Sequence, residues 1–395
     1  SHNVILLRLH SFFHPPPLIH PSPHVVSPSW PCNSSLVLSN SVTLPPSPHL
    51  PPPFLPGSPP PHPYRTLQAL SSWETLIKAT LDPSEASLLL SIIRDGFLPS
   101  VHSPPSAPIL HPNKISCAAD QSLLAEEMDK LLSMGVLRHV PSSFPILTLS
   151  AFVIRANGKE PRMVVNGRPF SSISSPAPSF RPDDVRVLAD MIQPGDFSIA
   201  TDISKLFYLI RLHPSVQPYL CLRHPLSGAD LSFVGLPMGI QQSPFVAHLL
   251  LKPLLIALRR FLHSRVVLYV DDLLILANSH SDALRQAAWL SQLAARLNIP
   301  LHPTKTDFNP ATSRIFLGMS ISSSPPTISL TRQRRLTSLA KIRSLRNRLR
   351  HHKPVSATFV ASLLGLLAAS SAASWPIRIF TIHLYRLQAL ILRRV

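Results

Sequence analysis

The sequence predicts a mixed α/β fold of the α+β kind, built around an antiparallel sheet. Two short β-prone runs, 265–268 and 273–276, flank Tyr269-Val270-Asp271-Asp272 and indicate a β-hairpin. A second hairpin is expected where Asn157-Gly158 separates the runs 151–155 and 161–168. The apolar stretch 246–262 is typical of a helix.

The Asp pair at the first hairpin is a candidate metal site, although an Asp-Asp turn taken alone could equally be a solvated bend. A third carboxylate, Asp202, closes the β-like run 197–202. Asp202 and Asp271 are too far apart in the sequence for local turn chemistry to join them. We therefore expect them to converge through the sheet.

The order of these segments resembles the palm motifs of the reverse transcriptase family. A strand ending in Asp202 is followed by the turn 236–245, the helix 246–262 and the Asp-Asp hairpin. The resemblance continues upstream in the helix 126–137 and the hairpin 151–168, and downstream in 297–306 and 314–321. The segment 361–368 is similar to the thumb region of DIRS-like retrotransposons. The resemblance covers about 120 to about 370 and implies a right-hand polymerase with fingers, palm and thumb.

The helix leading into the fingers has apolar positions on one face, including Leu124, Met128 and Leu131. Asp120 is its candidate N-cap, and Gly135 its candidate C-terminal stop.

The family resemblance implies RNA-directed DNA synthesis, in which a primer 3′-hydroxyl displaces pyrophosphate from a deoxynucleoside triphosphate. Two Mg²⁺ ions, with Mn²⁺ as a substitute, would activate the attacking oxygen and stabilise the leaving one. Mg²⁺ prefers oxygen ligands such as carboxylates and phosphates. Asp202 and Asp271 are the first-choice catalytic and metal-binding residues, with Asp272 as the weaker partner.

The same motif matches assign a set of nucleotide-binding residues: Arg155, Arg162, Ile203, Phe207, Gln241 and Lys305. Guanidinium groups suit a triphosphate, and Lys159 in the same hairpin is a further basic candidate. Each residue also has a plain structural interpretation. The basic residues would be ordinary surface charges, Phe207 a core ring, and Gln241 part of a helix entry.

The candidate template and primer contacts are Tyr269, Gly239, Ser243, Gly318, Arg343, Arg346 and Arg350. The three arginines lie in a basic segment, 332–353, whose apolar residues recur at helical spacing. We expect one face of this helix to pack and the others to meet phosphates. A solvated amphipathic helix and a membrane-surface helix are the alternatives.

Two departures from the family pattern put activity in doubt while leaving ancestry intact. Lys205-Leu206 precedes Phe207 where a polar or acidic residue and a small residue are usual, so Leu206 would crowd the sugar pocket. Asn166-Gly167 replaces an acidic-aromatic pair ahead of Arg168.

Composition fits a nucleic-acid partner, since 37 Lys and Arg against 19 Asp and Glu give a formal charge of +18. The domain hypothesis has four parts: a Pro/Ser/His-rich leader (1–64), short helices and linker (65–119), fingers and palm (120–322), and a basic thumb with the start of a post-thumb segment (323–395). We expect the chain to be part of a larger retroelement polyprotein.

Cys32, Cys117 and Cys221 are too dispersed for a disulfide framework, and no uninterrupted apolar span suits a membrane helix. An intracellular location, in cytoplasm or nucleus and without a membrane partner, is therefore expected.

Two rival hypotheses remain from the sequence. An inactive relic would keep the fold and nucleic-acid affinity but not the chemistry. A basic nucleic-acid-binding scaffold would use the Asp pair only as a turn, and it predicts Asp202 far from Asp271.

Overall fold

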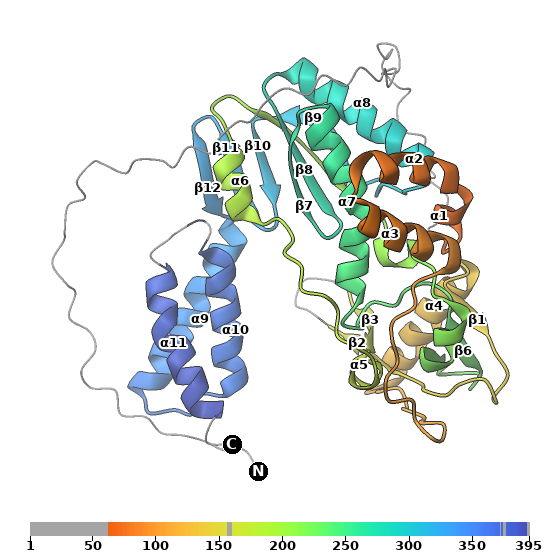
Figure 1. The fold of residues 1–395 in the computed structure, drawn as a ribbon. Coiled ribbons are helices and arrows are strands. Elements are labelled where there is room, and N and C mark those ends of the chain that lie inside the picture. The colour runs from red at the N-terminus through yellow and green to blue at the C-terminus, as the bar shows by residue number, and fades with distance from the viewer. Residues whose placement is uncertain (1–61, 156–159, 372, 374–376, 393–395) are drawn as a thin grey trace. The chain divides into compact units, whose positions relative to one another are not determined.

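A computed structural model describes residues 62–155, 160–371, 373 and 377–392 (Figure 1). These residues fall into two units, one ending at Ser329 and the other starting at Leu330. The predicted leader up to residue 61, and the residues Asn157, Gly158 and Lys159 of the second hairpin, lie outside the described residues.

The centre of the first unit is a four-stranded antiparallel sheet with strand order β7-β8-β4-β9. Its strands are β4 (Phe197–Asp202), β7 (Arg265–Tyr269), β8 (Asp272–Ala277) and β9 (Asp307–Ala311). Both predicted palm elements, the strand that ends in Asp202 and the Asp-Asp hairpin, are confirmed. Strands β7 and β8 are buried on both faces, which explains why they are continuous apolar runs rather than alternating ones.

Alternate residues of this sheet enter two apolar clusters. Ile199 and Ile275 belong to the main core, together with side chains of α7 (Ser243–Phe261) and α8 (His280–Arg296). Val267 and Leu274 belong to a smaller cluster with Leu188 of α6 (Val185–Met191). The helix predicted over 246–262 is thus α7, which begins three residues earlier with Pro244 in its first turn.

The fingers region combines α4 (Ala118–Ser133), α5 (Arg168–Ile173) and the hairpin β2 (Ser150–Ile154) and β3 (Arg162–Asn166). A separate antiparallel sheet, β1-β6-β5, is formed by β1 (Leu137–His139), β5 (Cys221–Arg223) and β6 (Asp230–Phe233). Two 3₁₀ helices, η1 (Leu206–Leu209) and η2 (Pro214–Tyr219), join β4 to β5.

Helix α4 corrects one prediction and confirms another. Asp120 is not the N-cap, because the helix begins at Ala118 and Cys117 takes the N-cap position. The Asp120 side chain is instead buried in the first turn, paired with Arg155. Gly135 does end the helix: its φ is 66°, and its N–H donates to Leu132 O at 2.9 Å.

The segment 65–94, for which one or two short helices were expected, forms three: α1 (Arg65–Gln68), α2 (Leu70–Thr80) and α3 (Pro83–Asp95). Helix α3 is capped by Asp82, whose Oδ1 accepts from Ser84 N and Glu85 N, each at 3.0 Å. Figure 1 shows these helices beside α7, with which α2 makes direct contact.

A third sheet, β10-β11-β12, follows the palm. It contains β10 (Ser313–Phe316), β11 (Met319–Ser323) and β12 (Pro326–Leu330), so the domain boundary predicted at 322/323 falls inside a strand. The Arg314 guanidinium ties this sheet to β4 by donating to Ser198 O at 3.1 Å. It also pairs with Asp307 at 2.6 Å.

The second unit contains α9 (Arg332–Arg350), α10 (Ala357–Ser370) and α11 (Ile377–Leu392). Helix α9 is the predicted basic helix, but the expectation that its apolar face packs is wrong. Leu336, Leu339 and Ile342 are 50%, 41% and 42% exposed. The buried position of the helix is polar, Ser338, whose hydroxyl donates to Arg334 O at 2.8 Å. The Lys341 ammonium donates to Ser362 Oγ of α10.

In the part of the chain that the structure describes, no helix is both long enough and apolar enough to cross a membrane. Cys117 and Cys221 are free thiols, the first exposed and the second buried.

A glycine pair joins the fingers to the loop before α7. A Cβ on Gly239, whose φ is 107°, would lie 2.3 Å from Val165 O, and a Cβ on Gly167 would lie 2.3 Å from Gly239 O. Two backbones can approach this closely only when neither carries a side chain. The unusual Gly167 therefore has a packing reason in this fold.

We predict that Gly239→Ala lowers the free energy of unfolding by about 3 kcal/mol or more, because left-handed strain and a backbone clash act together. Gly195→Ala is the control, since Gly195 has a φ of 80° but nothing within 4 Å of its Cβ position. The control should lose only about 1–2 kcal/mol from strain. Urea unfolding measures both, and equal losses would contradict the clash.

Candidate active site

The pairing of β4 with β8 brings the three candidate carboxylates together. Asp202 lies directly opposite Asp272 in this antiparallel pair, and Tyr269 of β7 lies opposite Asp272 on its other side. Directly paired residues have Cβ atoms about 4.5–5.5 Å apart on the same face of a sheet. The Ile203 N–H also donates to Asp271 O at 3.1 Å. The predicted convergence through the sheet is therefore confirmed.

Asp271 sits in a strained two-residue turn. Val270 and Asp271 link Tyr269 to Asp272, and Val270 has a φ of 57°. Tight hairpin turns of this kind favour glycine at their first position, because a β-branched side chain is disfavoured in the left-handed region. Strain on the order of 1–3 kcal/mol is found where the surroundings fix a functional geometry.

The carboxylates repel one another. Burial raises the pKa of Asp272 to about 6, and the charges of Asp271 and Asp202 add to the effect. The pKa of Asp271 is also raised, first by burial and then by the charge of Asp202. Lys305 opposes both shifts. The cluster thus holds more negative charge than its neighbours compensate.

Lys305 supplies the nearest positive charge. Its ammonium lies 3.0 Å from Asp202 Oδ2, and its side chain is 61% exposed while that of Asp202 is 11% exposed. The lysine is therefore next to the carboxylates and bound to one of them.

The site offers carboxylate oxygens whose negative charge is not fully compensated. Oxygen atoms are the ligands that a hard divalent cation prefers. Among the described residues, however, no three His, Cys, Asp or Glu side chains are already spaced to hold an ion. Asp202 would have to exchange Lys305 for the ion. Asp202, Asp271 and Asp272 are the residues that would hold it.

The turn after Asp202 carries two other predicted residues. Ile203 is 1% exposed and pairs through its backbone with Leu301. Phe207 is partly buried in η1 against the main core. Leu206 is 1% exposed and points into that core, so it does not crowd the surface beside Phe207. The residue before it, Lys205, adopts a φ of 47°, which starts the turn.

The loop before α7 uses its polar side chains internally. Gln241 Nε2 donates to Ser171 O at 3.3 Å, and the buried Gln242 donates to Ser175 O at 2.7 Å. Ser243 is 1% exposed, and its hydroxyl donates to Pro237 O at 2.6 Å. A direct template contact from the Ser243 side chain is therefore corrected to a bracing role. Gln241 is exposed and braces the same segment.

The two fingers arginines differ. Arg155 pairs with the buried carboxylate of Asp120, whose pKa this contact lowers, so its guanidinium holds α4 to β2 rather than standing free. Arg162 at the start of β3 is exposed and has no ion pair with any described residue. Of the two, only Arg162 has no acidic partner among the described residues.

The predicted primer-side residues lie at hairpin tips. Tyr269 is 39% exposed beside the carboxylates. Gly318 has a φ of 71° and, with Leu317 at 48°, makes the two-residue turn between β10 and β11. Positive φ at both positions matches the right-handed twist of a hairpin.

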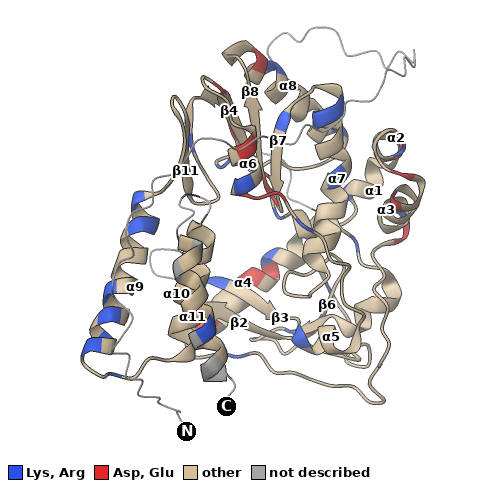
Figure 2. Cartoon of the chain, turned by 60° about the vertical axis from the view of Figure 1, so that its left-hand side comes forward, with Lys and Arg blue, Asp and Glu red and all other residues tan. Residues whose placement is uncertain are grey.

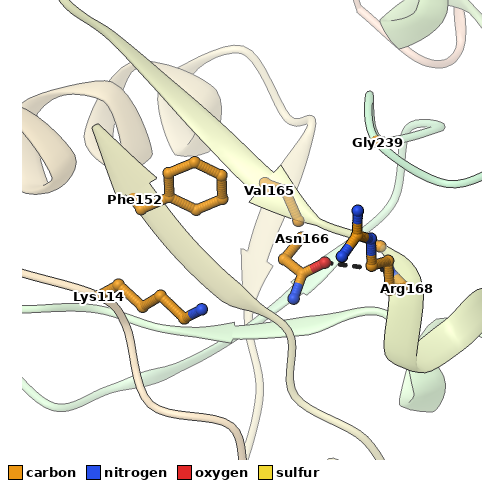
Figure 3. Close-up of a pocket in the computed structure, with 7 residues that line it drawn as sticks. Lys114, Phe152, Val165, Asn166, Arg168 and Gly239 are labelled. Atoms are coloured by element: carbon orange, nitrogen blue, oxygen red, sulfur yellow. Dashed lines mark hydrogen bonds between the residues drawn. The ribbon is translucent and has the colours of Figure 1, made fainter. Parts of the chain in front are cut away.

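The fingers contain a pocket of about 340 Å³ that sequence reasoning did not find (Figure 3). Lys114 and Phe152 lie on one side, and Asn166 and Arg168 on the other, with Gly167 and Gly239 completing the wall. Asn166 Oδ1 accepts from Arg168 N at 3.3 Å. Lys114 was missed because it precedes every motif and reaches β2 only through a bridge to Phe152.

Basic residues recur along the length of helix α9 (Figure 2). Arg343, Arg346 and Arg350 are exposed, and the sequence after Asp307 contains no Asp or Glu at all. The positive charge of this unit is therefore not neutralised by acidic side chains of its own.

A palm sheet with paired aspartates, a fingers hairpin and a following helical unit define the right-hand polymerase class. Residues 154–321 match the family model of the reverse transcriptase (RNA-dependent DNA polymerase). This part of the chain is thus a reverse transcriptase domain.

Two curated proteins are similar in sequence to parts of this chain. The Gag-Pro-Pol polyprotein of Human T-cell leukemia virus 2 is 32% identical over 154 residues, which are 36% of this chain and 10% of that protein. Protein P of Duck hepatitis B virus (strain Germany/DHBV-3) is 26% identical over 220 residues, which are 53% of this chain and 27% of that protein. The chain thus spans only a small part of either relative.

Solved structures agree in fold. The foamy viral protease-reverse transcriptase in complex with an RNA/DNA hybrid superposes with a TM-score of 0.54 at 16% identity, covering 75% of this chain and 39% of that one. The same foamy viral protein with double-stranded DNA gives a TM-score of 0.52 at 15% identity, covering 75% of this chain and 61% of that one.

We predict that Asp272→Asn stabilises the metal-free protein at high pH. Because folding raises this pKa from 3.8 to about 6, the stability that the carboxyl contributes is present below pH 3.8 and is lost as the pH rises through about 6. Near neutral pH the free energy of unfolding of the variant should exceed that of the parent by about 1 kcal/mol after solvent screening. Near pH 4 the two free energies should be about equal.

Urea unfolding with a chelator at several pH values measures this difference. Asp190→Asn, which removes an exposed carboxylate on α6, is the control and should show no pH-dependent gain. A gain for Asp272→Asn that is the same at every pH would contradict the electrostatic cause.

Proposed function

We propose that the protein is the RNA-directed DNA polymerase of a retrotransposon, adding deoxynucleoside triphosphates to a primer 3′-hydroxyl on an RNA or DNA template. The observation that carries the proposal is the register that sets Asp202 opposite Asp272, next to the Asp271 turn. The affinity with DIRS-like elements and membership of a larger polyprotein remain part of this proposal.

The carboxylates would hold two Mg²⁺ ions, which activate the attacking oxygen and stabilise the leaving one when bound. Asp202 and Asp271 would provide the main ligands, and Asp272 a weaker one. Its raised pKa supports this order, because a carboxyl with a pKa near 6 is partly protonated near neutral pH.

The surrounding residues would bind and orient the substrates. The exposed Arg162 would take the triphosphate, and Phe207, at the end of the Asp202 turn, would lie against the sugar. Lys305 would neutralise Asp202 before substrate binds and then move toward phosphate, since its long exposed side chain allows this. Ile203 would contribute its backbone rather than its buried side chain.

Template and primer would meet basic and open surfaces. Tyr269 and the Gly318 turn would approach the primer end, Gly239 would lie at the wall of the fingers pocket, and Lys114 and Arg168 would meet phosphates there. Arg343, Arg346 and Arg350 would contact the duplex backbone without reading sequence.

Of the two rivals, the scaffold predicts a large separation of Asp202 from Asp271. Asp202 and Asp271 instead lie on adjacent elements, which argues against the scaffold hypothesis. The relic hypothesis shares the fold, and only chemistry separates it from the polymerase.

We predict primer extension on an RNA template with Mg²⁺, and a loss of at least about a hundredfold in both Asp202→Asn and Asp271→Asn, because metal ligands contribute several kcal/mol to the transition state. Asp190→Asn should extend like the parent. Incorporation of labelled nucleotide is the measurement.

A second readout tests the metal site independently of the chemistry. Mg²⁺ should raise the melting temperature of the parent but not of Asp202→Asn, since binding to the folded state stabilises it. A folded parent that binds primer–template and extends nothing would overturn the polymerase proposal.

We predict that replacing Arg343, Arg346 and Arg350 together by Gln weakens binding to a primer–template duplex and flattens its salt dependence. Each lost phosphate contact should reduce the slope of log K against log salt by about 0.9, so three should reduce it by about 2.7. Fluorescence anisotropy over a salt series measures the slope.

The matched control replaces Lys78, Arg186 and Arg285, three exposed basic residues of α2, α6 and α8, by Gln. Net charge falls equally, so an equal change of slope in the control would show a general charge effect rather than contacts on α9.

A further inference from the structure

Helices α1–α3 lie before the part of the chain that matches the family model, yet they pack against the palm. We propose that they are a positioning element, which fixes the Phe207 turn and the Lys305 loop relative to Asp202 and thereby sets the shape of the nucleotide pocket. The inference rests on the proposed function for its consequence, but its structural basis does not require activity.

The first anchor is Thr66 in α1. This residue is 3% exposed, and its hydroxyl donates to Leu209 O at 3.1 Å. Leu209 ends η1, in which Ile210 N also donates to Phe207 O at 3.1 Å. Thr66 therefore holds the end of the short helix that carries Phe207.

The exit of α3 continues this anchor. Phe97 N donates to Arg211 O at 2.7 Å, and His213 N donates to Phe97 O at 3.0 Å. Between α3 and this bridge, Gly96 has a φ of 95°, and a Cβ there would lie 2.7 Å from His213 N. The chain after η1 is thus fixed by backbone bonds to the segment that follows α3.

The second anchor is Trp73 in α2. Its side chain is 0% exposed, and its Nε1–H donates to Leu297 O at 3.1 Å. Next along the chain, Asn298 Nδ2 donates to Arg65 O at 3.2 Å. Leu297 and Asn298 follow the end of α8, where the chain turns toward the active site.

From this second anchor the chain runs directly to the carboxylates. Ser204 N donates to Pro300 O at 2.9 Å, and His302 N donates to Asp202 O at 2.8 Å. Lys305, a little further on, pairs with the Asp202 side chain. A displacement at Leu297 would therefore move the backbone that borders Asp202.

Both anchored carbonyls lie at helix ends, where no bond within the helix is available to satisfy them. A buried carbonyl that loses its donor carries a desolvation cost, so the two segments have a strong preference for the positions that Thr66 and Trp73 define. Ion pairs of Glu85 with Lys252 and of Glu74 with Arg94 hold α3 to α7 and to α2.

The proposal makes a prediction that global destabilisation cannot mimic, because each anchor controls a different segment. Thr66→Val should raise amide hydrogen exchange about fivefold to tenfold at Tyr208 and Ile210, and not at His302. Trp73→Phe, which removes the indole N–H donor together with part of the buried ring, should raise exchange at His302 and not at Tyr208 or Ile210. Thr75→Val is the control, because the Thr75 hydroxyl bonds only within α2, to Ser71 O.

A second arm measures nucleotide selection without chemistry. Ternary complexes of the full chain with a dideoxy-terminated primer, a template and Mg²⁺ would be trapped with the next dNTP or the matching rNTP. The family resemblance gives Phe207 the aromatic position that blocks a ribose 2′-hydroxyl. The preference for dNTP should therefore fall several-fold in Thr66→Val, through a changed Phe207 position, and should stay at the parent value in Thr75→Val.

The outcomes separate cleanly. Equal exchange at both segments in both variants, or exchange like the parent, would overturn the positioning role. Segment-specific exchange with unchanged dNTP preference would also overturn it, since the helices would then only stabilise the fold. If the parent forms no ternary complex, the proposed function fails and with it the effect on nucleotide selection, while segment-specific exchange would still show that Thr66 and Trp73 hold these two segments.

Discussion

The antiparallel pairing of β4 with β8 is the constraint on which the rest of the site depends. It converts a large separation along the chain into direct adjacency, by setting Asp202 opposite Asp272. The register is fixed because a slip by one residue would turn Ile199 and Ile275 out of the main core and Leu274 out of the second cluster. Apolar burial on two faces therefore specifies where two polar groups meet.

The same pairing gathers negative charge at one edge of the sheet. Carboxylates gathered at a partly buried edge are unfavourable without a counter-charge, and the raised pKa values of Asp271 and Asp272 express this. Lys305 compensates part of this negative charge through its ion pair with Asp202. The basic unit after Leu330 has the opposite imbalance, with arginines and no acids. Each region is suited to a partner of opposite charge, a cation at the carboxylates and a polyanion at α9.

Much of the fold and the centre of the site could be predicted from sequence, because both hairpins, α7 and the three aspartates are encoded by local patterns. What failed were features decided by tertiary packing. The Ser243 hydroxyl donates to Pro237 O, and Arg155 forms an ion pair with Asp120. The apolar spacing of α9 did not indicate that Ser338 would be the buried position. Lys114 and Trp73 lie outside every motif, and only the folded chain shows their partners.

The contact between Gly167 and Gly239 bears on how this lineage could have changed. An aromatic residue is usual in the family at the position of Gly167, and in this backbone its first side-chain atom would collide with Gly239 O. The two positions are therefore coupled, because a side chain at residue 167 would fit only if the loop before α7 moved as well. A difference that looks like random decay in the sequence is thus held in place by packing, since residue 167 can gain a side chain only together with a change in that loop.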